Sequence, residues 1–506
     1  MKLLGIDVGT GGTRAVVIDK RGVVVASATS EHAPFASPQT GWAEQDPRDW
    51  WRASAEAIRM VLNQPNVNAD DIACIGFSGQ MHGAVLLDDR GEVLRPSLIW
   101  CDQRTDSQCR SITELVGAER LIEWTSNPAL TGFTLPKLLW VREQEPDVWE
   151  RVRTVLLPKD YVRLRLTGEK ATDVADASGT LLFDVANRRW SDSMLDVTAI
   201  NRNLLPAVFE APEVTGHVSD QGAVATGLRK GTPVVGGAGD QAAGAVGMGI
   251  VRPGAVSATI GTSGVVFAAT DRPALDPQGR VHTFCHAVPG RWHVMGVTQA
   301  AGLSLRWFRD RFGVPASGCN DKADPYDLLC AEAETAPPGS DGILWAPYLM
   351  GERTPHLDPH ARAALVGLAA SHTRAHVVRS ILEGVAFSLR DTLTIFAEMK
   401  VPVETIRLGG GGARSRLWQQ IQADVYGHTV ETLAAEEGAA YGAAVLAGVG
   451  ARVWPSVDEA CRQTVHVAAR IEPNRDAASI MNHRYAAFRE LYPALRTISK
   501  LHFVVD

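Results

Sequence analysis

The sequence predicts an α/β protein of two similar lobes, each with a mixed sheet flanked by helices, and a cleft between them. The first observation is a glycine–threonine turn that occurs twice, at 5–13 and at 257–264. The second is that each copy joins two apolar, β-rich runs, as a β-hairpin does. The third is the spacing, because Thr10 and Thr262 stand close to half a chain apart. Such a repeat predicts two lobes that offer their turns to one ligand.

The repeated turn suits a phosphate group. Glycine tolerates positive φ and leaves backbone N–H groups exposed, so that successive N–H groups can hold an anion. A Gly-Thr turn alone is a weak signal, since most such turns are only hairpins. The two copies differ in that Asp7 of the first is replaced by Thr259 in the second. An acid there would repel phosphate, so Asp7 predicts a Mg²⁺ ion held through water. The alternative is an aspartate that caps the turn.

The first half of the chain opens with strands and then alternates strands with helices. A helix is expected to begin near Asp46, which suits the N-cap, with Pro47 at the first helical position. Strands are expected at 2–8, 13–19, 23–29, 72–78, 85–88 and 98–100. Three antiparallel strands followed by strand–helix alternation predict a mixed sheet flanked by helices.

The second half repeats this plan. A long helix is expected from Arg374 to Glu398, with Thr373 as its N-cap and an apolar face at helical spacing. Strands are expected at 254–260, 264–269 and 292–298. The boundary is expected near 247–253, which divides the chain into lobes at 1–248 and 249–506.

Composition excludes several classes of protein. The 506 residues carry a net charge of −7, which argues against a general nucleic-acid or anionic-membrane binder. No apolar run approaches the roughly 20 residues of a membrane helix, and no secretory signal is visible. The seven cysteines form no CxxC pair, which fits reduced thiols in the cytoplasm.

A second glycine-rich turn, at 236–244, joins an expected strand to an expected helix and contains Asp240. Asp240 stands where the helix begins, so an ordinary N-cap is one interpretation. The small residues before it clear an approach that a cap does not need, which favours catalysis. In phosphoryl transfer an aspartate orients the attacking hydroxyl and accepts its proton. Nearby helix N–H groups are expected to keep this carboxylate ionised and only weakly basic.

Another glycine turn, at 408–414, leaves room for a flat ring or a pyrophosphate against the backbone, although a simple loop is the alternative. It lacks the spacing of a dinucleotide-binding GxGxxG, and the chain contains no GxxxxGK[ST] motif. The small residues at 438–444 look like part of a helix and are expected to pack closely against this turn rather than to bind a ligand.

Two segments of the first half suit a polyol. His82 lies between Gly79 and Gly83 in a tight loop, which favours a ligand contact over a structural role. Trp100 precedes Asp102 and Arg104 at the end of an expected strand, offering an aromatic face beside polar groups. A tryptophan in the core beside a surface Asp–Arg pair is an equal alternative.

Together these residues resemble the FGGY family of carbohydrate kinases, of the actin–hexokinase–Hsp70 (RNase H-like) fold group. The resemblance runs over nearly the whole chain. Its two signature regions correspond to 132–140 and 366–384. Segments typical of the branch that phosphorylates D-xylulose are 42–47, 80–83, 157–161 and 351–356.

The resemblance implies roles residue by residue. Asp240 would be the base toward the sugar hydroxyl, and Asp7 an acid of the Mg²⁺–ATP site. The implied sugar-binding residues are Met81, His82, Trp100, Asp102 and Gln241. The implied nucleotide-binding residues are Thr10, Gly11, Thr13, Gly261, Thr262, Gly410, Gly411, Gly412 and Ala413.

Three positions depart from the pattern of that branch. Cys101 and Gln241 each replace a frequent asparagine beside the sugar site, and Arg14 replaces a frequent lysine. The first two bear on substrate preference more than on the reaction. Glycerol kinases carry Arg-Glu where Met81 and His82 stand, which argues against glycerol.

The expected activity is phosphorylation of D-xylulose to D-xylulose 5-phosphate by ATP with Mg²⁺. The sugar would lie mainly against the first lobe and ATP mainly against the second. The resemblance also implies a homodimer. The alternatives are a kinase for another ketopentose or polyol, such as ribulose, and a sugar-independent ATPase switch of the same fold group.

Overall fold

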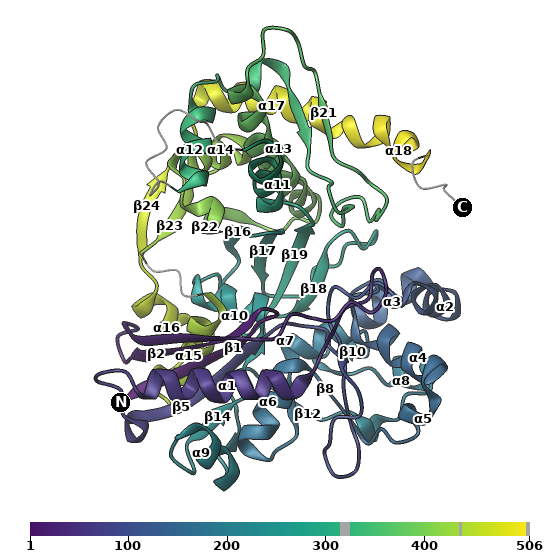
Figure 1. Ribbon diagram of the computed structural model, residues 1–506, viewed down its shortest axis with the longest axis vertical. Helices are drawn as coiled ribbons and strands as arrows, with labels where there is room; N and C mark the ends of the chain where they lie inside the picture. Colours follow the sequence, from purple (N-terminus) through teal and green to yellow (C-terminus); the bar gives the residue numbers. More distant parts are fainter. Residues whose placement is uncertain (314–323, 435–437, 502–506) are drawn as a thin grey trace.

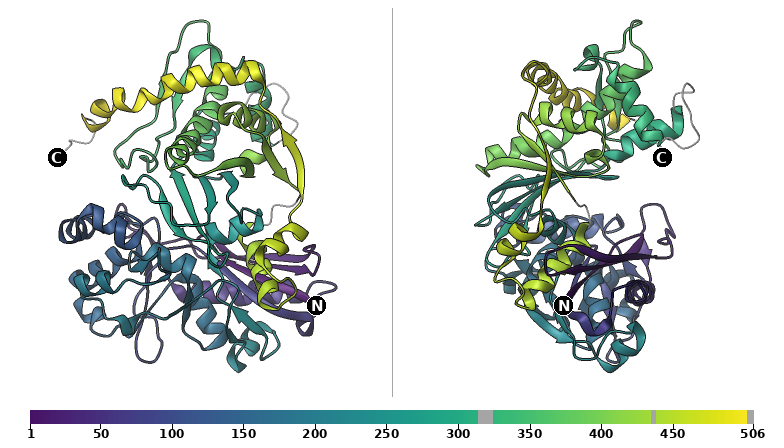
Figure 2. Two further views of the ribbon diagram at one scale, coloured as in Figure 1. Left: turned by 180° about the vertical axis from the view of Figure 1, so that it is seen from behind. Right: turned by 90° about the vertical axis from the view of Figure 1, so that its left-hand side faces the viewer.

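The computed structural model of the protein describes residues 1–313, 324–434 and 438–501 (Figure 1). Among these residues, each of two lobes is built on a seven-stranded sheet. The first lobe lies at the bottom of Figure 1 and the second at the top, and Figure 2 shows the same arrangement from two other sides. The predicted fold class, two α/β lobes with mixed sheets flanked by helices, is confirmed.

The first sheet has the strand order β13-β14-β5-β1-β2-β3, with β15 also paired to β5. Strands β1, β2 and β3 are antiparallel, whereas β5 runs parallel to β1 and to β14. The strands are β1 (Lys2–Val8), β2 (Gly12–Asp19), β3 (Val24–Glu31), β5 (Ile72–Gly79), β13 (Val214–His217), β14 (Pro233–Val235) and β15 (Ala238–Gly239).

The second sheet has the order β18-β19-β17-β16-β22-β23-β24 and repeats the first. Strands β16 and β17 form the second hairpin, and β22 runs parallel to β16 as β5 does to β1. The strands are β16 (Gly254–Ile260), β17 (Gly264–Thr270), β18 (His282–Cys285), β19 (Trp292–Thr298), β22 (Val403–Gly410), β23 (Val430–Leu433) and β24 (Val467–Ile471). The sequence repeat is therefore a structural repeat.

The predicted long helix, α13 (Arg374–Glu398), is confirmed. Its N-cap is Thr373, and the side chains of Thr373 and His376 form a capping box. The helix packs against β17, β19 and β20 (Leu344–Ala346), so its apolar side chains fill the core of the second lobe. The helix expected near Asp46 is α1 (Pro47–Leu62), which covers β2 and β3.

The helix α15 (Gly438–Gly450) lies between α10 (Asp240–Gly247) and the first sheet. Its small residues permit this, because a Cβ on Gly442 would lie 1.8 Å from the carbonyl oxygen of Ala243. The helix is closely packed as expected, but its partners are α10 and the first sheet rather than the turn at 408–414. In Figure 1 the yellow-green α15 and α16 (Val457–Thr464) accordingly lie among the purple strands of the first lobe. The chain thus returns to the first lobe after residue 249.

Shorter elements complete the two lobes. The helices are α2 (Asp106–Val116), α3 (Ala118–Thr125), α4 (Thr134–Gln144), α5 (Pro146–Trp149), α6 (Pro158–Thr167), α7 (Val174–Ala177), α8 (Asp192–Thr198), α9 (Asp220–Thr226), α11 (Gly302–Phe312), α12 (Pro325–Glu334), α14 (Arg416–Tyr426), α17 (Arg475–Arg489) and α18 (Leu491–Leu501). The strands are β4 (Glu44–Gln45), β6 (Val85–Leu87), β7 (Ser97–Leu98), β8 (Thr154–Leu156), β9 (Ala171–Asp173), β10 (Phe183–Asp184), β11 (Arg189–Trp190), β12 (Ala207–Phe209) and β21 (Ala364–Val366). Across the described ranges, every helix is too short or too polar to cross a membrane.

Candidate active site

Each of the two repeated turns is closed by a backbone hydrogen bond, although the first turn is one residue longer than the second. In the first, the Gly9 amide donates to the carbonyl of Gly12 at 3.0 Å, and in the second the Gly261 amide donates to the carbonyl of Ser263 at 2.9 Å. A cavity of about 430 Å³ lies between the lobes. Its walls combine both halves of the chain, with Asp7, Arg14, Asp240, Gln241 and Gly244 from the first and Ser257, Thr259, Gly409 and Gly410 from the second.

Asp240 is the first residue of α10, and its carboxylate lines this cavity. The N-cap interpretation is wrong, because the N-cap residue is Gly239 and Asp240 is already the first residue of the helix. Burial, and then the nearby charge of Asp7, raise the pKa of Asp240 to about 7. The expectation of a weakly basic carboxylate is therefore wrong as well. Desolvation and like charge outweigh the helix N–H groups.

Asp7 lies near the end of β1 and faces the same cavity. One of its carboxylate oxygens, Oδ1, is buried and finds no hydrogen-bond partner in the part of the chain that the structure describes. Burial raises the pKa of Asp7, and Ser78 and Arg14 oppose that rise. An acid that lines the same cavity as Asp240 and keeps one oxygen without a hydrogen-bond partner fits a divalent cation. No group of three acidic, histidine or cysteine ligands exists among the described residues, so water and phosphate would supply further ligands.

A separate cavity of about 290 Å³ lies in the second lobe beside the second turn. Among the expected nucleotide residues, Gly261, Thr262, Gly411 and Gly412 line it. The sequence did not predict the helical walls of this cavity, which include Leu305 and Arg306 on α11, Tyr326, Asp327 and Cys330 on α12, and Trp418 on α14. These residues lie on ordinary amphipathic helices, where no local pattern marks a ligand contact.

The glycines of the 408–414 turn are required for packing. A Cβ on Gly412 would lie 2.7 Å from Ile260 of β16, and Gly410 adopts φ +72°. The short 3₁₀ turn at Gly411–Ala413 therefore rests directly on the end of β16. This close approach places the backbone of the turn along the cavity wall.

His82 follows the tight loop after β5 and adopts φ +70°. Its Nδ1 lies 2.8 Å from the carbonyl oxygen of Gly179, and its ring stacks on Phe133 at 4.8 Å. Burial and the nearby charge of Lys137 hold the pKa of His82 well below its usual value. The ring is therefore neutral. Since a carbonyl only accepts, Nδ1 carries the proton and Nε2 is left as an acceptor.

Met81 connects this loop to Asp240. A Cβ on Gly239 would lie 2.7 Å from Cγ of Met81, so the methionine packs directly against the residue before Asp240. Gln241 lines the cavity and donates from Nε2 to Oδ1 of Asp240 at 3.3 Å. The structure thus brings Gln241 into contact with Asp240 and Met81 against the preceding Gly239, with His82 next to Met81 in the chain.

The nucleotide-binding residues expected in the first turn differ in how far they are exposed to the cleft. Trp100 donates from Nε1 to the hydroxyl of Thr10 at 3.0 Å, which ties the predicted sugar segment to the turn. Gly11 lies exposed at the tip. Thr13 is fully buried and bonds to His32 at 2.9 Å and to Ser54 at 3.1 Å. The hydroxyl of Thr13 therefore holds β2 against α1 and does not reach the cleft.

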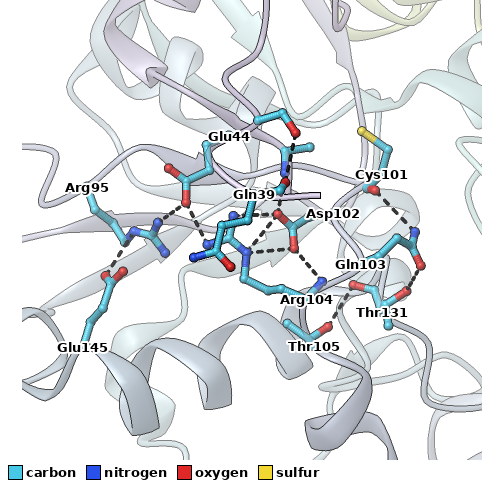
Figure 3. Close-up of polar contacts among 12 residues, drawn as sticks. Gln39, Glu44, Arg95, Cys101, Asp102, Gln103, Arg104, Thr105, Thr131 and Glu145 are labelled. Carbon is cyan, nitrogen blue, oxygen red and sulfur yellow. Dashed lines mark hydrogen bonds and ion pairs between the residues drawn. The ribbon is translucent and has the colours of Figure 1, made fainter. Parts of the chain in front are cut away.

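Asp102 is also fully buried (Figure 3). Its Oδ2 accepts from the amide of Ala43 at 2.6 Å and from Nη2 of Arg104 at 2.7 Å. The guanidinium of Arg104 lies 3.6 Å from the ring of Trp42 and reaches Glu44 at 2.8 Å. Of the two alternatives for this segment, the Asp–Arg pair is present, but it is buried rather than on the surface. The carboxylate of Asp102 fixes the loop that carries Trp100 and Cys101.

Lys137, on α4, supports the sugar loop in a role that the sequence did not predict. Its Nζ donates to the carbonyl of His82 at 2.9 Å and to that of Gly132 at 2.6 Å. Burial lowers the pKa of Lys137 to about 7. The residue stands within a signature region of the family, which is the signal that could have found it.

A two-lobed α/β fold with a repeated glycine–threonine turn and a buried aspartate in the cleft is typical of a class of phosphoryl-transfer enzymes. Sequence comparison gives the family. The N-terminal domain of the FGGY family of carbohydrate kinases matches residues 2–247, and the C-terminal domain matches residues 256–451. The chain belongs to this family, and it is an ATP-dependent sugar kinase.

Individual relatives are similar over nearly their whole length. The xylulose kinase of Bacillus subtilis (strain 168) is 38% identical over 98% of this chain and 97% of its own. The xylulose kinase of Escherichia coli (strain K12) is 39% identical over 97% of this chain and 99% of its own. A crystal structure described as a xyloylose kinase from Brucella ovis is 37% identical, has a TM-score of 0.91, and is matched over 98% of this chain and 100% of its own.

Proposed function

We propose that the protein transfers the γ-phosphoryl group of ATP to D-xylulose and forms D-xylulose 5-phosphate. The observation that carries this proposal is the position of Asp240, which lines the cleft between the two lobes and follows Gly239, the residue against which Met81 packs. Full-length similarity to enzymes named xylulose kinase supports the choice of sugar.

Asp240 acts as the base. The sugar hydroxyl attacks the γ-phosphorus, the bond from phosphorus to the bridging oxygen breaks, and ADP leaves while the hydroxyl proton passes to the carboxylate. A pKa near 7 suits this role, because a catalytic base is most effective when its pKa is close to the working pH. Met81 and His82 hold the sugar, and Nε2 of His82 accepts a hydrogen bond from a sugar hydroxyl.

The nucleotide binds mainly to the second lobe. The cavity of about 290 Å³ receives the nucleoside against the 3₁₀ turn, and Gly261 and Thr262 bind phosphate with backbone and hydroxyl donors. Thr10 and Gly11 approach the phosphates from the first lobe. When bound, Mg²⁺ supplies positive charge to the phosphate oxygens, and Asp7 would hold it through its unpartnered oxygen.

The decisive experiment measures ADP release over a panel of D-xylulose, ribulose, gluconate and glycerol. We expect a clear preference in kcat/KM for D-xylulose. A preference for another sugar would overturn the substrate, and ATP turnover without sugar would favour an ATPase switch.

The division of labour between residues 1–248 and 249–506, sugar on the first and nucleotide on the second, belongs to the same proposal. We also propose a cytoplasmic homodimer. Free thiols at the described cysteines suit a reducing compartment, and the dimer rests on family habit. Light scattering of the purified protein tests the dimer, since a monomer at micromolar concentration would exclude it.

A further inference from the structure

Arg353 is a cation from the second lobe that none of the roles above uses. It lies in the segment between β20 and β21. Its backbone is held on both sides, because its amide donates to Oε1 of Glu352 at 2.8 Å and its carbonyl accepts from the amide of Leu357 at 2.6 Å. Glu352 is itself anchored by the hydroxyl of Thr298 at 2.5 Å. The segment therefore presents the Arg353 side chain from a fixed position.

That side chain reaches the first lobe. A Cβ built on Gly132 would lie 3.5 Å from Nη2 of Arg353 and 3.0 Å from the carbonyl oxygen of Trp100. Gly132 is one of the two carbonyl partners of Lys137. The guanidinium thus lies beside the loop that carries Trp100 and beside Gly132, which shares Lys137 with His82. It reaches them from the other half of the chain.

The guanidinium finds no hydrogen-bond or ion-pair partner in the described ranges of the chain. Burial lowers the pKa of Arg353, since the opposing charges of Glu352 and Cys101 do not compensate for it. The nearest acid, Glu352, uses its oxygens on Thr298, Gln299 and the Arg353 amide. A partly buried guanidinium whose donors have no protein partner is available to bind a ligand.

The surroundings of Arg353 define the chemistry of that ligand. Lys137 is committed to two carbonyl groups, and burial lowers the pKa values of His82 and His282, so both rings are neutral. An Arg353 guanidinium offers donors only. The ligand must therefore present oxygen acceptors, as the carbonyl and hydroxyl groups of a sugar do.

A chain of contacts gives the position of Arg353 relative to the reaction. Met81 packs on Gly239 beside Asp240, His82 follows Met81 and stacks on Phe133, and Gly132, which precedes Phe133, touches Arg353. Asp240 and Arg353 lie at the two ends of this series of contacts. A sugar whose reacting hydroxyl lies at Asp240 would turn its other end toward Arg353.

We propose that Arg353 binds the end of the ketose remote from the reacting hydroxyl, donating hydrogen bonds to the C2 carbonyl and the C1 hydroxyl. This inference rests on the proposed function and adds a substrate-binding residue from the lobe that holds the nucleotide. Because the donor comes from the second lobe, the sugar bridges the two lobes when it binds.

The test compares D-xylulose with 1-deoxy-D-xylulose in wild type, Arg353→Met and Arg353→Lys. For Arg353→Met, KM for D-xylulose should rise about 10- to 100-fold, the range for lost hydrogen bonds to a charged group. KM for ATP should stay nearly unchanged. The rise should be smaller for 1-deoxy-D-xylulose, which lacks the C1 hydroxyl. Arg353→Lys should recover part of the affinity for D-xylulose.

Arg362→Met is the matched control, because Arg362 belongs to the same segment and its guanidinium donates to the nearby carbonyls of Pro359 and Ala361. It should leave both sugar KM values unchanged. An unchanged KM for D-xylulose in Arg353→Met, or equal losses for the two sugars, overturns the inference. If Arg353→Met does not fold, Arg353→Gln is compared in the same way. A wild-type protein that does not phosphorylate D-xylulose would instead overturn the proposed function.

Discussion

The two hairpins share one backbone plan but differ at the position that matters chemically. In the first, Asp7 pairs in register with Arg14, and in the second the corresponding pair is Thr259 and Val265. Oδ1 of Asp7 has no hydrogen-bond partner among the described residues, whereas Thr259 donates to the carbonyl of Val265 across its hairpin at 3.4 Å. The two lobes thus carry similar hairpins, and among the described residues that line the cleft the acids, Asp7 and Asp240, both come from the first lobe.

The largest expected effect tests whether catalysis belongs to the first lobe. Asp240→Ala should lower kcat about 10³-fold, within the range for loss of a general base. ATP affinity, measured by calorimetry, should change little because the nucleotide cavity lies in the second lobe. Asp220→Ala is the control, since Asp220 occupies the same first position of helix α9 but is exposed. Substantial residual kcat in Asp240→Ala would remove Asp240 from the base role.

The next effect compares the two turns directly. Asp7→Ala should lower kcat about 10²-fold, because the Mg²⁺ that would stabilise negative charge on the transferring phosphate loses a residue that holds it. Thr259→Ala, at the equivalent position, should lower kcat less than about fivefold because only a weak hydrogen bond is lost. A magnesium titration of both variants gives the measurement, and the apparent Mg²⁺ affinity should fall only in Asp7→Ala. Normal ATP-dependent turnover by Asp7→Ala would exclude the metal role.

Much of the fold could be predicted because it is encoded locally. The hairpins follow from apolar runs on either side of a glycine turn, and α13 follows from its cap and its apolar face. The return of α15 to the first sheet could not be predicted in the same way. Small residues at 438–444 permit close packing, but they do not specify which surface is approached.

Prediction of the candidate site was limited in the same way, because local sequence does not specify contacts between distant residues. The glycine turn before Asp240 marks the residue in the sequence, because the pattern is continuous along the chain. The pKa of Asp240 is not marked, since it depends on burial and on Asp7, which lies far away in the sequence. Thr13 and Asp102 have residue types that suit ligands, yet both side chains are turned into the protein. A role for Arg353 could not be predicted from the sequence, because the residues that it faces, Gly132 and Trp100, belong to the opposite lobe.

Asp102 gives the third prediction, which separates acids that hold the fold from acids that face the cleft. Asp102→Ala should lower the free energy of unfolding by about 3 kcal/mol, because a buried partner of Arg104 is removed. Denaturant unfolding measures this loss. Asp106→Ala is the control, since Asp106 forms an exposed pair with Arg110 on α2 and should leave stability nearly unchanged. A stable Asp102→Ala protein with a raised KM for sugar would return Asp102 to the sugar site.

The smallest expected effect is a shift in pH dependence that links the two cleft acids. The pKa of Asp240 is raised to about 7, so the fraction of enzyme with an ionised base falls as pH drops through that value. We expect kcat/KM for the sugar to fall with it, with a slope of one proton. Asp7→Asn should move the midpoint to lower pH, because the negative charge of Asp7 raises the pKa of Asp240. Gln241→Leu should move it to higher pH, since Gln241 donates to the ionised carboxylate. Opposite shifts in the residual activity of these two variants would assign the titration to Asp240. A midpoint that neither variant moves would assign it to another group, and the base would then have to be sought elsewhere in the cleft.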